Sequence, residues 1–255
     1  MSELVSCLMV TRNRLDLARQ AARCFAEQTW CNKELVIVDD GDQDYTPLVE
    51  ELRAGGHAVR YHRIAAHPEV RLGGLRNLSL DLAGGEWCVQ WDDDDWYHPD
   101  RIATQMAARG AATGVALQWT LVHVESPTLG MLAYRADTGI ATPGTILHRR
   151  DAARYPNLAR AEDGVFLRDV RRAGGLNVLG SAHSHLFVRR FHGHNTWDER
   201  HFLARLHRRP TDWWSYAAAR LMHRDIRRHR AFQLDERERS AIDELRRTRA
   251  EVGSA

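Results

Sequence analysis

Four consecutive aspartates, Asp92 to Asp95, are the residues of this chain whose type and spacing most clearly suggest chemistry; they stand in the segment QWDDDDWYHPDR. They follow an apolar run at residues 86–91 that is typical of a short buried strand, so they occupy the loop after it. Adjacent carboxylates repel each other by roughly 1 kcal/mol in water, and by more in a partly dry cleft, unless a cation offsets their charge. We therefore expect a divalent metal. The alternative is a solvated acidic turn, but Trp91 and Trp96 flank the run and favour a concave site.

Three other segments contain residues suited to binding a nucleotide diphosphate. They read TRNR at residues 11–14, DDG at 39–41 and RLGGLRN at 71–77. An acidic side chain can accept hydrogen bonds from a base or a ribose, arginines bind phosphate, and glycines let the backbone approach closely. If the strands before these segments are parallel, they meet the aspartates at the carboxyl edge of one sheet, where open α/β sheets bind ligands.

The pattern along residues 1–114 supports such a sheet. Apolar runs of strand length alternate with stretches that have apolar residues at helical spacing. This alternation favours right-handed βαβ crossovers and a doubly wound, mostly parallel sheet. We expect strands at residues 5–10, 34–39, 60–64 and 86–91, and helices at residues 15–28, 46–54, 75–83 and 99–109, the last with Pro99 in its first turn.

Beyond residue 114 the alternation is less regular. A helix is expected at residues 162–173, because its apolar residues have helical spacing and Gly174-Gly175 end it. From residue 202 onward the chain reads as mostly helical and rich in arginine. Strands are expected at residues 115–125, 130–135 and 144–149.

The ordered set of motifs resembles the inverting, family-2-type nucleotide-sugar glycosyltransferases of the GT-A fold. The resemblance covers residues 5–196 and rests on TRNR, on VDDG after the second strand, on RLGGLRN, and on GEWCVQWDDDDWYHPDR. It implies a Rossmann-related, mostly parallel central sheet flanked by helices, with a helical C-terminal extension. It also implies that residues 1–114 bind the donor, that residues 115–197 bind the acceptor, and that residues 198–255 form the extension.

The resemblance implies a donor site for a UDP-, GDP- or dTDP-linked sugar. In it Asp40 binds the nucleobase, Arg71 contacts the nucleotide, and Asp92 lies near the ribose or the metal. One feature departs from the family, which usually has an aromatic residue where this chain has Arg12. The full set of residues implied for donor binding is Thr11, Arg14, Asp40, Arg71, Asp92 and Asp93.

The resemblance also implies a metal, Mn²⁺ or Mg²⁺, bound by the DxD motif. Asp94 and Asp92 match this motif, and the run of four aspartates leaves the assignment within it open by one position. Imidazole is a common ligand for ions of this kind. His192, in the segment RFHGHN, matches the family's metal-binding histidine best, and His194 is the alternative.

The acidic pair Glu162-Asp163, in AEDGVFLRDV, matches the family's catalytic acids, and we assign the general base to Asp163. A base must accept a proton from an acceptor hydroxyl as that oxygen attacks the anomeric carbon, while the charge on the leaving diphosphate is neutralised. Taken alone, an acidic pair at the start of a helix is also explained by the helix dipole.

Two other functions use the same features. A metal-dependent phosphohydrolase or nucleotidyltransferase would use the aspartates, but it needs further carboxylates from other strands. The basic C-terminal segment, with a net charge of +4 over residues 198–255 against −2 over residues 1–197, suggests nucleic acid or a membrane surface. Its acids alternate with arginines, which is typical of a salt-bridged helix surface. We therefore expect no nucleic-acid partner and keep the membrane, contacted through Trp213 and Trp214, as an alternative.

The four cysteines, at positions 7, 24, 31 and 88, have no spacing typical of zinc or redox sites. We expect buried free thiols in a reducing environment. No run of 18 apolar residues and no basic-then-apolar leader is present in the sequence, so we expect a cytoplasmic protein.

Overall fold

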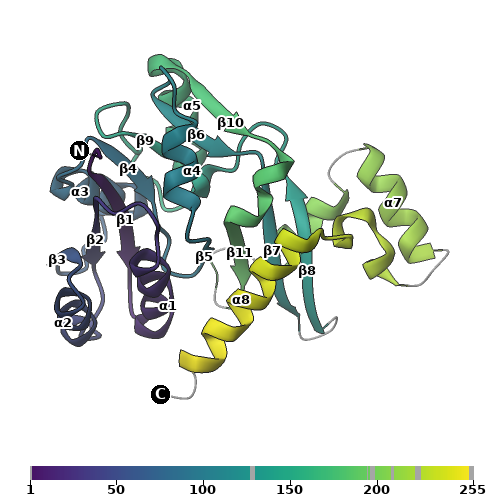
Figure 1. The fold of residues 1–255 in the computed structure, drawn as a ribbon, viewed down its shortest axis with the longest axis horizontal. Coiled ribbons are helices and arrows are strands. Elements are labelled where there is room, and N and C mark those ends of the chain that lie inside the picture. Colours follow the sequence, from purple (N-terminus) through teal and green to yellow (C-terminus); the bar gives the residue numbers. More distant parts are fainter. Residues whose placement is uncertain are drawn as a thin grey trace.

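The structure, a computed structural model, describes residues 2–126, 130–193, 195, 199–207, 210–221 and 225–252. These residues form two sheets, which lie beside each other in Figure 1. The larger sheet contains, in spatial order, β10 (Leu176–Leu179), β6 (Gly114–Leu117), β9 (Leu147–Arg149), β4 (Trp87–Gln90), β1 (Val5–Thr11), β2 (Lys33–Asp39) and β3 (Ala58–Arg63). The smaller sheet contains β5 (Trp96–Tyr97), β11 (Phe187–Phe191), β7 (Trp119–Ser126) and β8 (Gly130–Asp137).

Strands β3, β2, β1 and β4 are parallel. Strands β1, β2 and β4 are buried because their sequences are nearly continuous apolar runs, which suit strands covered on both faces, whereas β3 at the edge of the sheet is mostly exposed. The chain adds β2 on one side of β1 and β4 on the other, so the direction of sheet growth reverses at β1. Thr11 pairs with Asp39 at the end of β1, and Leu8 pairs with Gln90 at the end of β4. The carboxyl ends of the three strands therefore meet at a topological switch point.

Helices cover both faces of the larger sheet, and they are α1 (Leu15–Ala26), α2 (Thr46–Ala54), α3 (Leu72–Leu82), α4 (Arg101–Ala107) and α5 (Glu162–Gly174). Alternate residues of β1 point to opposite faces. Met9 packs in a cluster with Phe25 of α1, whereas Leu8 packs in a cluster with Phe166 of α5. The predicted mostly parallel central sheet with helices on both sides is confirmed.

The C-terminal segment is helical, as predicted, and one of its helices is tied to the smaller sheet. Its helices are α6 (Glu199–Leu203), α7 (Pro210–Leu221) and α8 (Glu236–Val252). At the start of α8 the Glu238 N–H donates to Asp235 Oδ1, and the Asp235 N–H donates to Glu238 Oε2, both at 2.9 Å, which is a reciprocal helix cap. The buried Glu238 also pairs with Arg135 of β8 at 3.0 Å. In Figure 1, α8 crosses toward α1, while α7 lies at the opposite end of the molecule from α2. Short 3₁₀ turns are η1 (Pro143–Thr145), η2 (Ser181–Leu186), η3 (Ala204–His207), η4 (Ile226–Arg228) and η5 (Arg230–Phe232).

The structure corrects several predicted elements. The strand expected at residues 115–125 is two strands, β6 and β7, which belong to different sheets. They separate at Gln118, whose N–H donates to the Leu179 carbonyl at the end of β10 and whose carbonyl accepts from the Thr138 N–H after β8. Pro99 precedes its helix, which begins at Arg101. The strand expected at residues 144–149 begins with the 3₁₀ turn η1 and is reduced to β9, which runs antiparallel to β4.

Two further findings concern the cysteines and the membrane. Cys7, Cys24 and Cys88 are buried free thiols as expected, but Cys31 is exposed because it lies in the connection between α1 and β2. Within the described part of the chain, no helix is both long and apolar enough to cross a bilayer.

Candidate active site

A cavity of about 460 Å³ opens at the carboxyl ends of β1, β2 and β4, a size typical of small-molecule sites. All four polar segments that the sequence singled out contribute to its wall, because the parallel strands end at the same edge. His192 is not part of the wall but lies 3.5 Å from Asp94, measured from Nε2 to Oδ2. The other eight predicted site residues line the cavity: Thr11, Arg14, Asp40, Arg71, Asp92, Asp93, Asp94 and Asp163.

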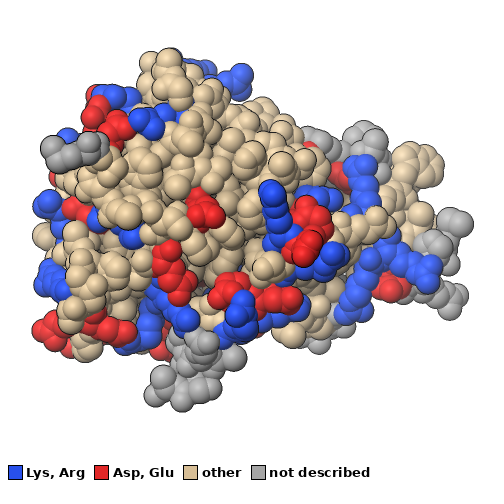
Figure 2. Space-filling model, in the orientation of Figure 1, with Lys and Arg blue, Asp and Glu red and all other residues tan. Residues whose placement is uncertain are grey.

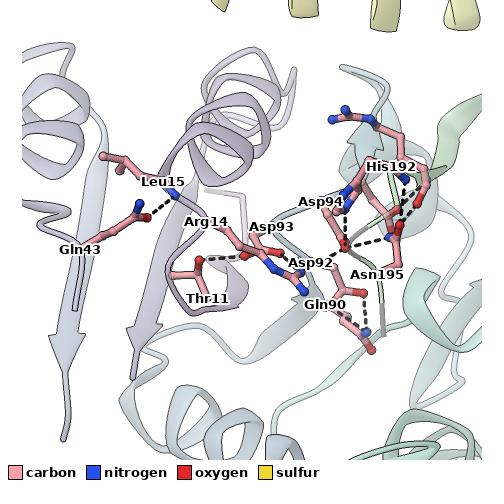
Figure 3. A network of polar contacts seen from close by, with 12 residues as sticks. Thr11, Arg14, Leu15, Gln43, Gln90, Asp92, Asp93, Asp94, His192 and Asn195 are labelled. Carbon is pink, nitrogen blue, oxygen red and sulfur yellow. Dashed lines mark hydrogen bonds and ion pairs between the residues drawn. The ribbon is translucent and has the colours of Figure 1, made fainter. Parts of the chain in front are cut away.

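Asp93 is held by the protein from the side of β1 (Figure 3). The Thr11 hydroxyl donates to Asp93 Oδ2 at 2.7 Å, and it lies 2.8 Å from the Tyr45 hydroxyl. Because Thr11 has one proton to donate, Tyr45 is the donor in the second bond. Arg14 Nη1 lies 3.3 Å from both Asp93 Oδ1 and Asp94 Oδ2. Burial and the charge of Asp94 raise the pKa of Asp93 to about 7. Thr11 and Arg14 thus position the aspartates.

Asp94 faces the segment that follows β11 (Figure 3). Its Oδ2 accepts a hydrogen bond from Asn195 Nδ2 at 3.2 Å, in addition to its contacts with His192 and Arg14. Asn195 also fixes this segment, because its Oδ1 accepts from the His192 N–H at 2.8 Å and its Nδ2 donates to the Arg190 carbonyl at 2.9 Å. Burial opposes the charged form of Asp94, but His192 and Arg14 outweigh it and lower its pKa.

The separation of Asp94 Oδ2 and His192 Nε2 fits two ligands of one divalent cation. Ligands about 2.1 Å from an ion lie roughly 3.0–3.5 Å from each other in tetrahedral or octahedral geometry. Within the described ranges, however, no three His, Cys, Asp or Glu side chains are grouped so as to hold a metal. Asp92, predicted as a third ligand, is not grouped with the other two, and His194, the alternative, lies outside the described residues.

Asp92 is bound from the side of α3. Its Oδ1 accepts from Arg76 Nη2 at 2.8 Å, and its Oδ2 accepts from Gln90 Nε2 at 2.9 Å. Arg76 is buried and also donates from Nε to Glu162 Oε1 at 3.1 Å. Burial disfavours the charged guanidinium, but Asp92 and Glu162 outweigh this and raise the pKa of Arg76. One buried arginine therefore connects the aspartate run to the start of α5.

Asp95 completes the run and points into the interior. It is buried, and its Oδ1 accepts from the backbone N–H of Arg190 in β11 at 3.1 Å. Burial and the charge of Asp94 raise its pKa well above the usual range. Asp95 therefore ties the loop after β4 to β11 of the smaller sheet, although it also borders the cavity.

Asp39 and Asp40, the acidic pair at the end of β2, have different roles. Asp39 is buried; it accepts from the Gly41 N–H at 2.8 Å and from the Tyr61 hydroxyl at 2.9 Å, so it shapes the turn. Asp40 lines the cavity, where its only ion-pair neighbour among the described residues is Arg12, 3.7 Å away. Burial raises the pKa of Asp40, and Arg12 opposes this shift. Asp40 is therefore the acid of this pair that can meet a ligand.

Glu162 and Asp163, the acidic pair at the start of α5, also have different roles. Ala161, with φ of 60°, turns the chain sharply into α5. Glu162 is buried against Arg76, and burial raises its pKa. Asp163 lines the cavity, and its Oδ1 accepts a hydrogen bond from the Gly164 N–H at 2.8 Å. Asp163 is thus the accessible carboxylate of the pair.

A known family accounts for this arrangement. The sequence profile described as "Glycosyl transferase family 2" matches residues 6–168, well over half of the chain. The chain belongs to glycosyl transferase family 2.

Several curated relatives are named as glycosyltransferases. The putative colanic acid biosynthesis glycosyl transferase WcaA of Escherichia coli (strain K12) is 34% identical over 107 residues, which are 41% of this chain and 37% of that protein. The chain spans about a third of the length of the curated relatives it matches.

Solved structures share the fold of this family 2 chain. S. aureus TarS 1-349, in complex with UDP-GlcNAc, has a TM-score of 0.59 at 16% identity and covers 76% of this chain and 60% of its own. The mannosyltransferase PcManGT from Pyrobaculum calidifontis, in complex with GDP-Man and Mn²⁺, has a TM-score of 0.57 at 15% identity and covers 98% of this chain and 76% of its own. The expected GT-A fold is confirmed.

Sequence reasoning gave no role to several polar residues that line the cavity of this family 2 protein, including four from α3, from β11 and from the segment after β11. Arg76 lies within the RLGGLRN segment already noted, and its helical spacing from the start of α3 is the signal that it faces inward. The other three stand on or after β11, whose two arginines interrupt the apolar pattern by which a strand is predicted. The four residues are Arg76, Arg189, Arg190 and Asn195.

Proposed function

We propose that this chain transfers a sugar from a nucleotide-diphosphate donor to an acceptor hydroxyl, with inversion at the anomeric carbon and with a divalent metal. The observation that carries the proposal is that Asp163, Asp40 and the Asp92–Asp94 stretch face one cavity at the switch point of the sheet. Family membership supports glycosyl transfer over the alternative phosphohydrolase or nucleotidyltransferase chemistry.

In this proposal residues 1–114 bind a UDP-, GDP- or dTDP-linked sugar and residues 115–197 bind the acceptor. Asp40 accepts hydrogen bonds from the nucleobase at the far end of the cavity. Arg71, at the start of α3, contacts the nucleotide; its backbone N–H is fixed by Asn157 at 2.9 Å, and its side chain is exposed on the cavity wall. TarS and PcManGT, solved with UDP-GlcNAc and with GDP-Man, respectively, support a donor of this kind.

The metal, Mn²⁺ or Mg²⁺, would be held by Asp94 and His192. Ions of this type are commonly bound by one or two protein side chains, with the remaining positions taken by substrate phosphates and water. When bound, the metal would neutralise charge on the donor diphosphate. PcManGT, solved with Mn²⁺, supports a metal in this fold.

Asp163 acts as the general base. It accepts the proton of the acceptor hydroxyl while that oxygen forms a bond to the anomeric carbon and the bond from this carbon to the diphosphate oxygen breaks. Glu162 is unsuited to this role because it is buried and paired with Arg76. A single displacement needs only one base and inverts the anomeric configuration.

A product assay tests the proposal without knowledge of the acceptor. The protein is incubated with UDP-, GDP- and dTDP-sugars and MnCl₂, and slow donor hydrolysis is followed, with water as acceptor. We expect free sugar and a nucleoside diphosphate from at least one donor, and loss of both products with EDTA. Release of inorganic phosphate or a nucleoside monophosphate would instead support the phosphohydrolase or nucleotidyltransferase alternative.

A second proposal concerns a membrane surface. Trp213 and Trp214 of α7 are 51% and 71% exposed, and Leu221 at the end of the same helix is 79% exposed. Tryptophan is favoured at the membrane interface, and the net charge of +4 in residues 198–255 suits anionic lipids. Figure 2 shows arginine or lysine side chains near this end of the molecule. We propose that α7 rests on an anionic bilayer, which would place a membrane-attached acceptor near the site, since Phe202 of the neighbouring α6 lines the cavity.

A further inference from the structure

Arg189 of β11 differs from Arg14, Arg76 and Arg190 on the same cavity wall in having no hydrogen-bond or ion-pair partner among the described residues. Arg14 is paired with Asp93 and Asp94, Arg76 is paired with carboxylates on both sides, and Arg190 donates to Gln20 at 2.6 Å. The guanidinium of Arg189 makes no hydrogen bond or ion pair with any residue that the structure describes, although it stacks 5.9 Å above the ring of Phe187. Among the described residues, none uses the five N–H donors of this side chain, which can therefore bind a ligand.

The guanidinium of Arg189 fits beside Gly144 only because this residue has no side chain. A Cβ atom added to Gly144 would lie 2.6 Å from Arg189 Nη2 and 3.4 Å from Asp92 Oδ2. The guanidinium thus occupies the space that any larger residue at position 144 would fill. The two distances also place Nη2 within about 6 Å of Asp92 Oδ2, although no ion pair within 4.0 Å forms between these two side chains.

The charge on Arg189 is stabilised by carboxylates from both sides of the reaction centre. Burial disfavours the charged form, but Asp95, Asp163 and Asp92 outweigh it and raise the pKa of Arg189. Asp163 is the proposed base, and Asp92 belongs to the proposed donor site. Arg189 therefore lies within electrostatic range of both partners in the displacement and is charged when a donor binds.

We propose that Arg189 binds the β-phosphate of the donor and stabilises the nucleoside diphosphate as it leaves. The inference rests on the proposed glycosyl transfer. When the bond between the anomeric carbon and the β-phosphate oxygen breaks, the electron pair stays on that oxygen, and the proton of the acceptor passes to Asp163. A guanidinium can donate two parallel N–H bonds to phosphate oxygens, and such bonds strengthen as negative charge grows.

The test compares binding of nucleoside diphosphates and monophosphates by calorimetry in the presence of MnCl₂. UDP, GDP and dTDP are the probes, each paired with its monophosphate, and the proteins are wild type, Arg189→Met and Arg189→Lys. We expect Arg189→Met to weaken binding of the diphosphate at least tenfold and to leave binding of the monophosphate unchanged, because only the diphosphate has a β-phosphate. Arg189→Lys should recover part of the loss, since it keeps the charge without the two-pronged geometry.

Two further variants separate this role from a structural one. Gly144→Ala should also weaken diphosphate binding, because the new methyl group displaces the guanidinium without changing any charge. Arg172→Met removes an exposed arginine of α5, outside the cavity wall, and should change neither affinity. Equal diphosphate affinity in wild type and Arg189→Met would overturn the role of Arg189 and leave the donor site intact. Failure of the wild type to bind any diphosphate would overturn both this inference and the proposed function.

Discussion

Asp94 Oδ2 and His192 Nε2 lie 3.5 Å apart although they follow strands of different sheets, β4 and β11. The larger sheet brings the carboxylate and the smaller sheet brings the imidazole, so the proposed metal site exists only where the two sheets meet. We predict that Asp94→Ala and His192→Ala each lower donor turnover roughly a hundredfold or more, since metal stabilisation of a transition state amounts to several kcal/mol.

The measurement for these two variants is Mn²⁺ titration of donor hydrolysis. Asp151→Ala, which removes an exposed carboxylate that is not part of the cavity wall, serves as the control and should match wild type. Variants that keep the wild-type dependence on Mn²⁺ would show that the ion is bound elsewhere.

Asp163→Asn should abolish turnover and preserve donor binding. The amide keeps the size of the side chain and its place on the cavity wall, but it cannot accept the proton of the acceptor, so the rate should fall by roughly 10²- to 10⁴-fold. Steady-state kinetics and calorimetric binding of the nucleoside diphosphate, measured on the same preparation, check this. An equal loss of binding and of rate would contradict the role of a base and assign Asp163 to the donor site.

Arg76→Met should destabilise the fold, because it leaves the carboxylates of Asp92 and Glu162 without their cation. Removing one partner of a buried ion pair costs roughly 3–5 kcal/mol. Arg154→Met is the matched control, since Arg154 pairs with Asp81 at 2.7 Å on the exposed surface, where a pair contributes about 0–1 kcal/mol. Urea unfolding at neutral pH compares the two variants, and similar midpoints would show that Arg76 does not support the site.

Buried His148 should make stability depend on pH. Burial lowers its pKa from 6.5 to about 4, so the unfolded chain binds a proton at this position between these values and the folded chain does not. The contribution of this group to the free energy of unfolding is therefore fully present above pH 6.5 and is lost as the pH falls toward 4. The loss amounts to roughly 3 kcal/mol, because each pKa unit corresponds to 1.36 kcal/mol. His148→Phe, beside Phe166, should flatten the dependence of the urea midpoint on pH in this window, and an unchanged slope would contradict the assignment.

The exposed tryptophan pair of α7 gives a test of the membrane proposal. Trp213→Ala combined with Trp214→Ala should reduce sedimentation with phosphatidylserine-containing vesicles at low salt by about tenfold, because interfacial tryptophans and anionic lipid act together. Ile140→Ser removes another exposed apolar residue and serves as the control. If the wild type does not sediment with these vesicles at low salt, α7 has another role.

The donor side of the fold could be predicted from the sequence because local patterns specify it. Buried parallel strands read as continuous apolar runs, and polar residues directly after them must lie on one edge, so the sequence alone predicts that Thr11, Asp40 and Asp92 lie close together. The helix at residues 46–54 has the predicted bounds. Its proline and its apolar spacing are local signals that tertiary contacts do not alter.

The side formed by the smaller sheet was less predictable. Strand β5 has only two residues and β11 contains two arginines, so no apolar alternation marks either strand. They form because β11 pairs with β5 and with β7. Arg189 and Asn195 could not be assigned for the same reason. The ion pair of Arg76 with Glu162 joins residues far apart in the sequence, and no local pattern specifies such a contact.

Each of the four aspartates has a different partner: Arg76 for Asp92, Thr11 for Asp93, His192 for Asp94 and the Arg190 backbone for Asp95. The length of the stretch is therefore constrained as strictly as its charge. Deleting one aspartate would leave an acidic loop, but every later carboxylate would then face the partner that belongs to its neighbour. Substituting one aspartate would disturb a single contact. A chain shortened in this way should fail even though three acids remain.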